Sequence, residues 1–214
     1  DFQGSRGLGD VYKRQMMRIV KFQNIKYLWF KIKQQIIRRE KMRRIITGHN
    51  DEGKSVISID GPPARTLGED AGGLFEIWNT DGSGFDTVSN EDRADIDVVL
   101  SPVKGGTKFR YFQINPIPEG IPDEVIRAAT AEAFEKMGAA HHQIDTSRNA
   151  AMHETNTIDY IILLKGDVTL ILDEEEVRLK PHDVVVQRGT NHAWVNNGSE
   201  PAILIAVLID SELV

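Results

Sequence analysis

The sequence has no cysteine, so disulfide scaffolds, thiolate metal sites and cysteine nucleophiles are excluded. No apolar run reaches the ~20 residues that a membrane-spanning helix requires. Glycine-rich phosphate loops, the nucleophile elbow and heptad repeats are also absent. The 214 residues are 40% apolar and 27% charged, which is typical of an ordinary soluble globular protein.

Positive charge is concentrated near the start of the chain. Residues 1–44 carry 13 basic and 3 acidic side chains, and residues 45–214 carry 13 basic and 29 acidic ones. The two parts therefore have formal charges of +10 and −16. Because an acidic surface repels polyphosphate, we expect no nucleic acid partner for the folded part.

The first 41 residues differ from the rest. Residues 1–15 lack apolar periodicity and end like translated adaptor sequence, whereas residues 16–41 alternate apolar and basic side chains. We interpret 1–41 as a leader or disordered basic tail. A basic helix on a membrane or partner and a nucleic-acid arm remain as alternatives. Met16 is followed by no secretory pattern, and we predict a cytoplasmic protein without membrane contact through residues 16–41.

From Met42 onward, short apolar runs separated by Gly, Pro, Asn and Asp predict one β-rich domain over residues 42–214. One helix is expected over 122–138, packed outside a sheet. The links between the later strands are too short for helical crossovers, which predicts an antiparallel sandwich or barrel. The expected strands are 55–60, 73–80, 96–100, 107–115, 158–164, 168–172, 176–179, 184–187, 192–196 and 202–209.

Side chains that could carry chemistry lie in the last third. In an extended chain, alternate residues face one side. Two such sets occur: His153, Thr155, Thr157 and Asp159, and His192, Trp194 and Asn196. Two histidines with one carboxylate form a familiar ligand set for Fe(II), and imidazole with carboxylate also suits Mn, Ni or Zn. His141 and His142 are expected outside this pocket, as exposed or capping residues.

Two segments resemble the paired motifs of the cupin superfamily. The first motif runs His-x-His-x(3-4)-Glu-x(6)-Gly. His153 and Gly166 match it, Thr155 stands in place of the second histidine, and Asp159 in place of the glutamate. The metal motif is therefore degenerate.

The second motif ends Gly-x-x-His-x-x-x-Asn. Gly189, His192 and Asn196 match it, whereas His182 replaces an expected glycine. Together the motifs cover about 140–214 and place the core of the barrel at 150–214.

The first half is similar to a subgroup of single-domain bacterial cupins. Its members share segments like Met-Arg-Arg-Ile-Ile-Thr-Gly-His-Asn, Asp-Gly-Pro-Pro and Phe-Glu-Ile-Trp-Asn-Thr, which occur here between residues 42 and 80. The resemblance implies an all-β fold with one helix, a double-stranded β-helix or jelly-roll barrel around a central pocket. It implies no particular reaction, because fold does not fix function.

The departures from the motif exclude a full site of three histidines and one glutamate. A reduced site remains, in which His153, Asp159 and His192 hold one Fe, Mn, Ni or Zn ion. Thr155, Thr157, Trp194 and Asn196 would line the substrate pocket. The alternative is a polar, metal-free barrel interior in which these side chains satisfy one another.

Two classes of function follow. The first is a small-molecule metalloenzyme acting on a carbonyl, enol or carboxylate, as a metal-dependent oxygenase, isomerase, decarboxylase or dehydratase. The second is a metal-free cupin that binds a small ligand or uses His192 and Asp159 as an acid-base pair. A homodimer is also expected, because a small barrel would not fully bury the apolar side chains of its early strand: Leu74, Phe75, Ile77 and Trp78.

Overall fold

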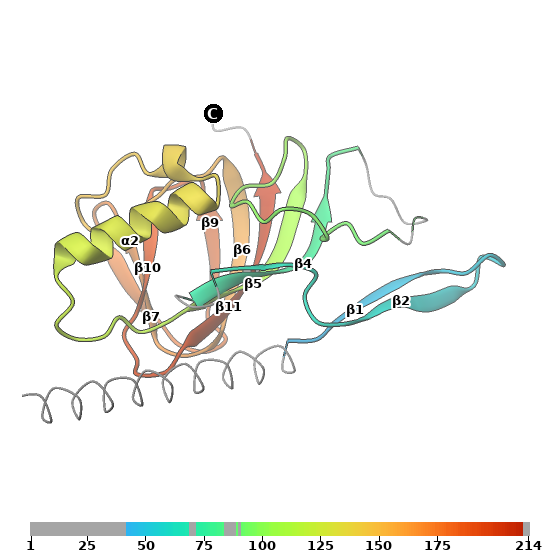
Figure 1. The fold of residues 1–214 in the computed structure, drawn as a ribbon, viewed down its shortest axis with the longest axis horizontal. Helices are drawn as coiled ribbons and strands as arrows, with labels where there is room; N and C mark the ends of the chain where they lie inside the picture. The colour runs from blue at the N-terminus through green and yellow to red at the C-terminus, as the bar shows by residue number, and fades with distance from the viewer. Residues whose placement is uncertain (1–41, 69–71, 84–88, 90, 212–214) are drawn as a thin grey trace, which may run out of the picture. The chain divides into compact units, whose positions relative to one another are not determined.

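Strands make up most of the chain in this computed structural model, which describes residues 42–68, 72–83, 89 and 91–211 (Figure 1). The predictions for residues 1–41 lie outside this part. Residues Arg43–Val214 form a single unit. The strands are β1 Arg44–His49, β2 Ser55–Gly61, β3 Thr66–Leu67, β4 Gly72–Thr80, β5 Thr107–Ile114, β6 Thr157–Lys165, β7 Val168–Leu172, β8 Glu176–Leu179, β9 Val184–Arg188, β10 His192–Asn196 and β11 Ala202–Asp210.

Two sheets form the barrel. One has the strand order β3-β4-β5-β11-β6-β9 and the other the order β10-β7-β8. All strand pairs recorded in the described chain are antiparallel. Strands distant in sequence, such as β5 and β11, are neighbours, as expected for a jelly roll. The prediction of an all-β jelly roll with one helix is confirmed.

The core lies between the two sheets, where alternate residues of each strand point inward. Leu163 of β6 and Leu204 of β11 meet Val168 of β7 and Leu179 of β8 in one buried cluster. Towards the other end of β5 and β6 the inward residues become polar, including Lys108, Arg110, Thr157 and Asp159. The barrel interior therefore has an apolar end and a polar end.

Register explains how this polar end is assembled. Lys108 of β5 and Asp159 of β6 are both Cα partners of Leu208 on β11. Since partners across a ladder share a face, both charged side chains point inward with Leu208. Polar residues from separate parts of the sequence thus meet on one surface.

One predicted strand is wrong. Residues 96–100 form irregular structure, because their backbone groups bond outside any ladder. The Leu100 N–H donates to the Met137 carbonyl at 3.1 Å, and the Val99 carbonyl accepts from Arg110 Nη2 at 2.9 Å. The loop is thereby fixed against the helix and β5, and two short strands, β1 and β3, are additional to those predicted.

The predicted helix is observed as α2, Asp123–Lys136, followed by a 3-10 turn η1, Ala140–His142. Pro122 is its N-cap and Gly138, at φ +64°, follows its end. Phe134 is its buried residue, with its ring 5.0 Å from the ring of His153. Within the described residues, no helix combines the length and apolarity needed to cross a membrane.

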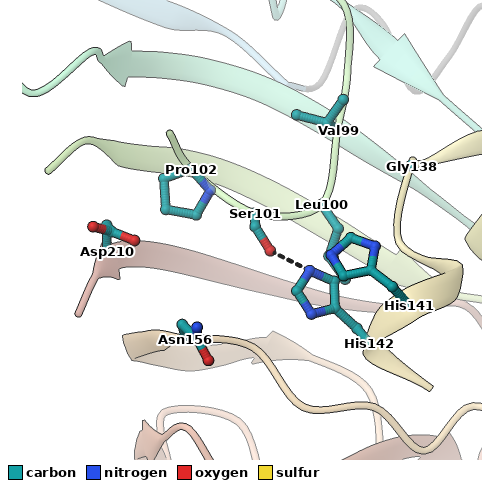
Figure 2. Close-up of a pocket in the computed structure, with 9 residues that line it drawn as sticks. All are labelled: Val99, Leu100, Ser101, Pro102, Gly138, His141, His142, Asn156 and Asp210. Carbon is teal, nitrogen blue, oxygen red and sulfur yellow. Dashed lines mark hydrogen bonds between the residues drawn. The ribbon is translucent and has the colours of Figure 1, made fainter. Parts of the chain in front are cut away.

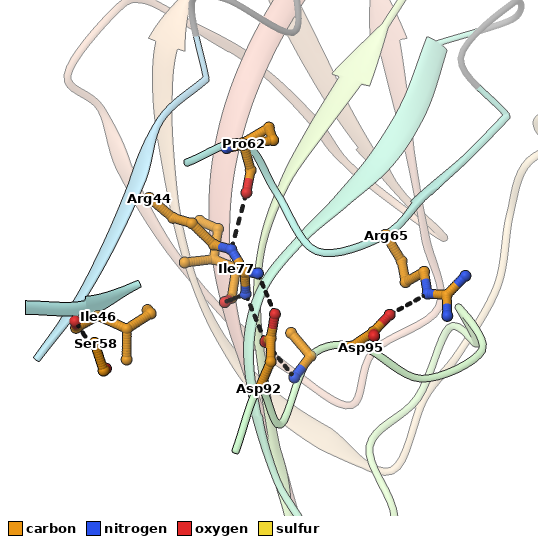
Figure 3. A network of polar contacts seen from close by, with 9 residues as sticks. Arg44, Ile46, Ser58, Pro62, Arg65, Ile77, Asp92 and Asp95 are labelled. Atoms are coloured by element: carbon orange, nitrogen blue, oxygen red, sulfur yellow. Dashed lines mark hydrogen bonds and ion pairs between the residues drawn. The ribbon is translucent and has the colours of Figure 1, made fainter. Parts of the chain in front are cut away.

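The β1–β2 hairpin forms a separate two-stranded sheet held to the barrel by one buried arginine (Figure 3). Arg44 donates to the carbonyls of Pro62 at 2.9 Å and Ile77 at 3.0 Å, and forms an ion pair with Asp92. Three acceptors around one guanidinium satisfy its fork of donors. Arg44 thus connects β1 to β4 and to the loop that follows it.

Candidate polar site at one end of the barrel

His153 and His192 form a pair at the polar end. His153 precedes β6 and His192 begins β10, and a two-residue antiparallel bridge joins them, with both N–H···O=C bonds at 2.9 Å. Their ring centroids are 4.3 Å apart. The two motifs identified in the sequence therefore place one imidazole each at the same point.

Hydrogen bonds fix the tautomer of both rings. Nδ1 of His153 lies 2.9 Å from the Ala151 carbonyl, and Nδ1 of His192 lies 2.9 Å from the Thr190 carbonyl. Because a carbonyl only accepts, each Nδ1 carries the proton and each Nε2 has a lone pair. Burial lowers the pKa of His153 to about 4 and that of His192 to about 3. Both rings are neutral at pH 7.

Asp159 is the buried carboxyl of this end. Burial raises its pKa to about 6, against the hydrogen bond from Thr157 and the charge of Arg110, which both lower it. Its Oδ1 is buried without a hydrogen-bond partner. Thr155 and Thr157 bond to each other at 2.7 Å, so the two hydroxyls form a short chain that ends at the carboxyl.

The sequence interpretation missed a buried charged cluster. Glu76 of β4 lies 3.0 Å from Arg110 and 3.9 Å from Lys108, both on β5, and the three side chains are at most 4% exposed. Burial lowers the pKa of Arg110, whereas Glu76 and Asp159 raise it. Lys108 and Arg110 are two residues apart in a predicted strand. This spacing indicates that both side chains lie on the same face of the sheet, and it is the sequence feature that could have revealed the cluster.

Two predicted pocket residues have structural contacts. Trp194 packs its ring edge-on against Phe112 at 5.9 Å and His192 at 5.7 Å. Asn196 donates to the carbonyls of Ile114 and Glu200, both at 2.8 Å. The Asn196 amide therefore connects β10 to β5, and its assignment to the substrate pocket stays a prediction.

The predicted metal triad is not assembled. In the part of the chain that the structure describes, no three His, Asp or Glu side chains are grouped so that they could hold one metal ion. His153 and His192 are together, but the Asp159 carboxyl instead interacts with Thr157 and Arg110. A cation beside the carboxylate opposes metal binding by charge repulsion. The donor set does not fit a three-ligand metal centre.

At pH 8, the Asp159→Asn variant is expected to exceed wild type in free energy of unfolding by on the order of 3 kcal/mol. The folded-state pKa of Asp159, about 6, lies above its ordinary 3.8, so folding favours the protonated form. The stability that the protonated Asp159 carboxyl contributes is present below about pH 4 and is lost as pH rises from about 4 to about 6.

Urea denaturation of both proteins at pH 4 and pH 8 measures this effect. Both proteins contain His153 and His192, so the titration of these groups cancels in the difference. A difference in stability that is the same at both pH values would contradict the buried, proton-binding carboxyl.

Comparison with known proteins identifies a matching family and several relatives. The Cupin domain family matches residues 142–208. The cupin-domain-containing oxidoreductase virC of Hypocrea virens is 31% identical over 175 residues, which cover 78% of this chain and 75% of that protein. Phomopsin biosynthesis cluster protein D of Diaporthe leptostromiformis is 30% identical over 163 residues, which cover 72% and 69%. The chain belongs to the cupin superfamily.

Solved structures with this likeness include the Cnp3 cupin domain of Schizosaccharomyces pombe. It is 9% identical, has a TM-score of 0.40 and covers 80% of this chain and 89% of that one. A cupin 2 conserved barrel domain protein of Salinispora arenicola is 16% identical, with a TM-score of 0.30 and coverage of 49% and 63%. The two named sequence relatives are fungal, so membership in the bacterial subgroup stays a prediction.

Proposed function

We propose that this chain is a cupin enzyme that transfers a proton on a small carbonyl, enol or carboxylate substrate without a metal. The observation that carries the proposal is the polar end of the barrel. There Asp159, with a pKa of about 6, and the neutral imidazoles of His153 and His192 project from adjoining segments. A carboxyl of this pKa is suited to exchange protons near neutral pH.

Each group has a separate task. Asp159 takes the proton from the carbon next to the carbonyl and returns it, which isomerises the substrate or eliminates a leaving group. The Nε2 lone pair of His192 accepts a hydrogen from the substrate hydroxyl or enol and orients it, with His153 beside it. Arg110 is a positioning residue, since its charge acts on the Asp159 carboxylate.

Solvent deuterium exchange tests this proposal without knowledge of the product. The full chain is incubated in D₂O with 2-oxo and 3-oxo acids, and loss of the C–H signal beside the carbonyl is followed by proton NMR. Wild type is expected to exchange at least one of them, and Asp159→Asn to lower the rate about 100-fold.

The matched control is Tyr160→Phe, because Tyr160 is adjacent in sequence, lies on the opposite face of β6 and is 50% exposed. This control is expected to keep the wild-type rate. If wild type exchanges none of the acids, or if Asp159→Asn exchanges as fast as wild type, the proposal is wrong.

The name of one relative, the cupin-domain-containing oxidoreductase virC, supports a second candidate, an oxidoreductase. The two Nε2 lone pairs, one on His153 and one on His192, are the donors that would bind a metal ion for such a reaction. Metal analysis of the purified protein and of the His153→Ala/His192→Ala double variant separates the candidates. If the wild type holds one equivalent of metal and the double variant holds none, the metal-dependent oxidoreductase is supported and metal-free proton transfer is wrong.

We also propose a homodimer, on a surface different from the one that the sequence indicated. Phe75 and Ile77 are buried within the protomer, which corrects that part of the argument. The outer face of β6 and the edge strand β9 instead exposes Tyr160, Val184 and Val186, each at least half exposed. An apolar edge strand favours pairing with a second copy.

Replacing Val186 with aspartate is expected to weaken the dimer at least 10-fold, because the charge would be desolvated at the interface. Light scattering over micromolar concentrations measures the mass. Val177→Asp is the control, since Val177 is 49% exposed on β8 of the other sheet. A monomeric wild type would remove this proposal.

A further inference from the structure

A cavity of about 270 Å³ lies beside the first residues of β6 and the end of β11, outside the set of residues used above (Figure 2). It is formed by the loop at residues 99–102, the turn η1, and the segments at Asn156 and Asp210. His141, which is exposed, and His142, which is half-buried, line it, and both lie outside the polar end of the barrel as expected. The same cavity contains Ser101.

Ser101 and His142 are hydrogen-bonded across this cavity. Ser101 Oγ lies 2.8 Å from His142 Nε2, although the residues are 41 positions apart in sequence. The main chain of His142 is held as well, since the Glu154 N–H donates to the His142 carbonyl at 2.9 Å. In the tautomer that carries the ring proton on Nδ1, Nε2 accepts from the serine hydroxyl.

This arrangement has the parts of an activated nucleophile. A serine hydroxyl lies within hydrogen-bond distance of an imidazole nitrogen, which takes its proton as a general base. Burial, with a contribution from the neighbouring His141, lowers the pKa of His142, so the base is unprotonated at neutral pH. The loop that carries Ser101 is joined to the end of α2 by the Leu100–Met137 bond.

The lining of the cavity indicates its ligand. Val99, Leu100 and Pro102 give it an apolar wall, and Asp210 is the charged side chain among its lining residues. A carboxylate disfavours anionic ligands. A small neutral molecule with an apolar group therefore fits better than a phosphate or a carboxylate.

We propose that Ser101 and His142 are the nucleophile and general base of an acyl-transfer site for small neutral esters. Ser101 Oγ attacks the ester carbonyl carbon while its proton passes to His142 Nε2. The bond to the alkoxy oxygen breaks, and that oxygen takes the proton and leaves as the alcohol. Water, activated by the same Nε2, then hydrolyses the acyl-serine to the carboxylic acid, and the side-chain amide of Asn156, which also lines the cavity, donates to the oxyanion.

A fluorophosphonate probe tests the nucleophile directly. The full chain is treated with the probe, digested with trypsin and analysed by mass spectrometry. The adduct is expected on peptide 94–104, in which Ser101 is the single hydroxyl residue. Ser101→Ala is expected to lose this adduct, whereas Ser147→Ala, a variant of an exposed serine, keeps it.

The kinetic test uses p-nitrophenyl acetate. Ser101→Ala is expected to lose the burst of p-nitrophenol, and His142→Gln to slow it about 100-fold. Asp159→Asn is expected to keep both the burst and the adduct. The result for the ester site is therefore independent of the result for proton transfer at Asp159. Unlabelled Ser101 in folded wild type, or an equal burst in Ser101→Ala, would overturn the proposal.

Discussion

Replacing Arg110 with methionine is expected to lower the free energy of unfolding by about 3–5 kcal/mol. Arg110 is 1% exposed and lies 3.0 Å from Glu76, which is equally buried. Without the guanidinium, the Glu76 carboxylate loses this ion pair, and Lys108 lies farther away, at 3.9 Å. The loss of stability arises because the ion pair no longer offsets the desolvation of a buried charge, and urea denaturation followed by circular dichroism measures it.

Two further variants make this test specific. The Glu76→Leu/Arg110→Met double variant is expected to recover part of the loss, because it removes the buried carboxylate together with its ion-pair partner. Arg178→Met, which breaks an exposed pair with Asp167, should leave the stability almost unchanged. Equal losses in the Arg110 and Arg178 variants would contradict the assignment of a buried charged cluster.

Replacing His192 with alanine is expected to lower the deuterium-exchange rate about 100-fold or more, and Thr155→Val to lower it less than 10-fold. His192 presents a fixed Nε2 lone pair in the paired rings. Thr155 reaches the Asp159 carboxyl only through Thr157, since the two threonine hydroxyls are hydrogen-bonded at 2.7 Å. Initial rates at pH 7 from the same NMR measurement compare the two variants.

Thermal unfolding of each variant accompanies the rates, because His192 also packs against Trp194. A folded His192→Ala variant with the wild-type rate would show that the imidazole pair takes no part in proton transfer. Equal losses in the two variants would assign the effect to the shape of the polar end as a whole.

The sequence by itself determined the fold class and most of the order of strands and helix along the chain. The strand predicted over 158–164 is found as β6, and Thr157 and Asp159, predicted to share one face, are both buried. Short links between the later strands permit only antiparallel neighbours. The helix was predictable from Pro122 and Gly138, because proline has a fixed φ that suits a helix start and glycine adopts the positive φ that follows a helix end.

Other features were decided by the tertiary structure. Residues 96–100 are apolar enough for a strand, yet Val99 and Leu100 use their backbone groups to bond Arg110 and Met137. Local pattern contains no information about such partners, since they are supplied by distant segments. For the same reason, the bond of Asn196 to Ile114 depends on how β10 meets β5.

The chemistry of the polar end was decided in the same way. Glu76 and Arg110 face each other because β4 pairs with β5, and Asp159 joins them because β11 lies between β5 and β6. The raised pKa of Asp159 follows from its burial, which exists only after the sheets close. The sequence supplied the residue types and their parity, whereas charges separated by tens of residues were brought together by strand order.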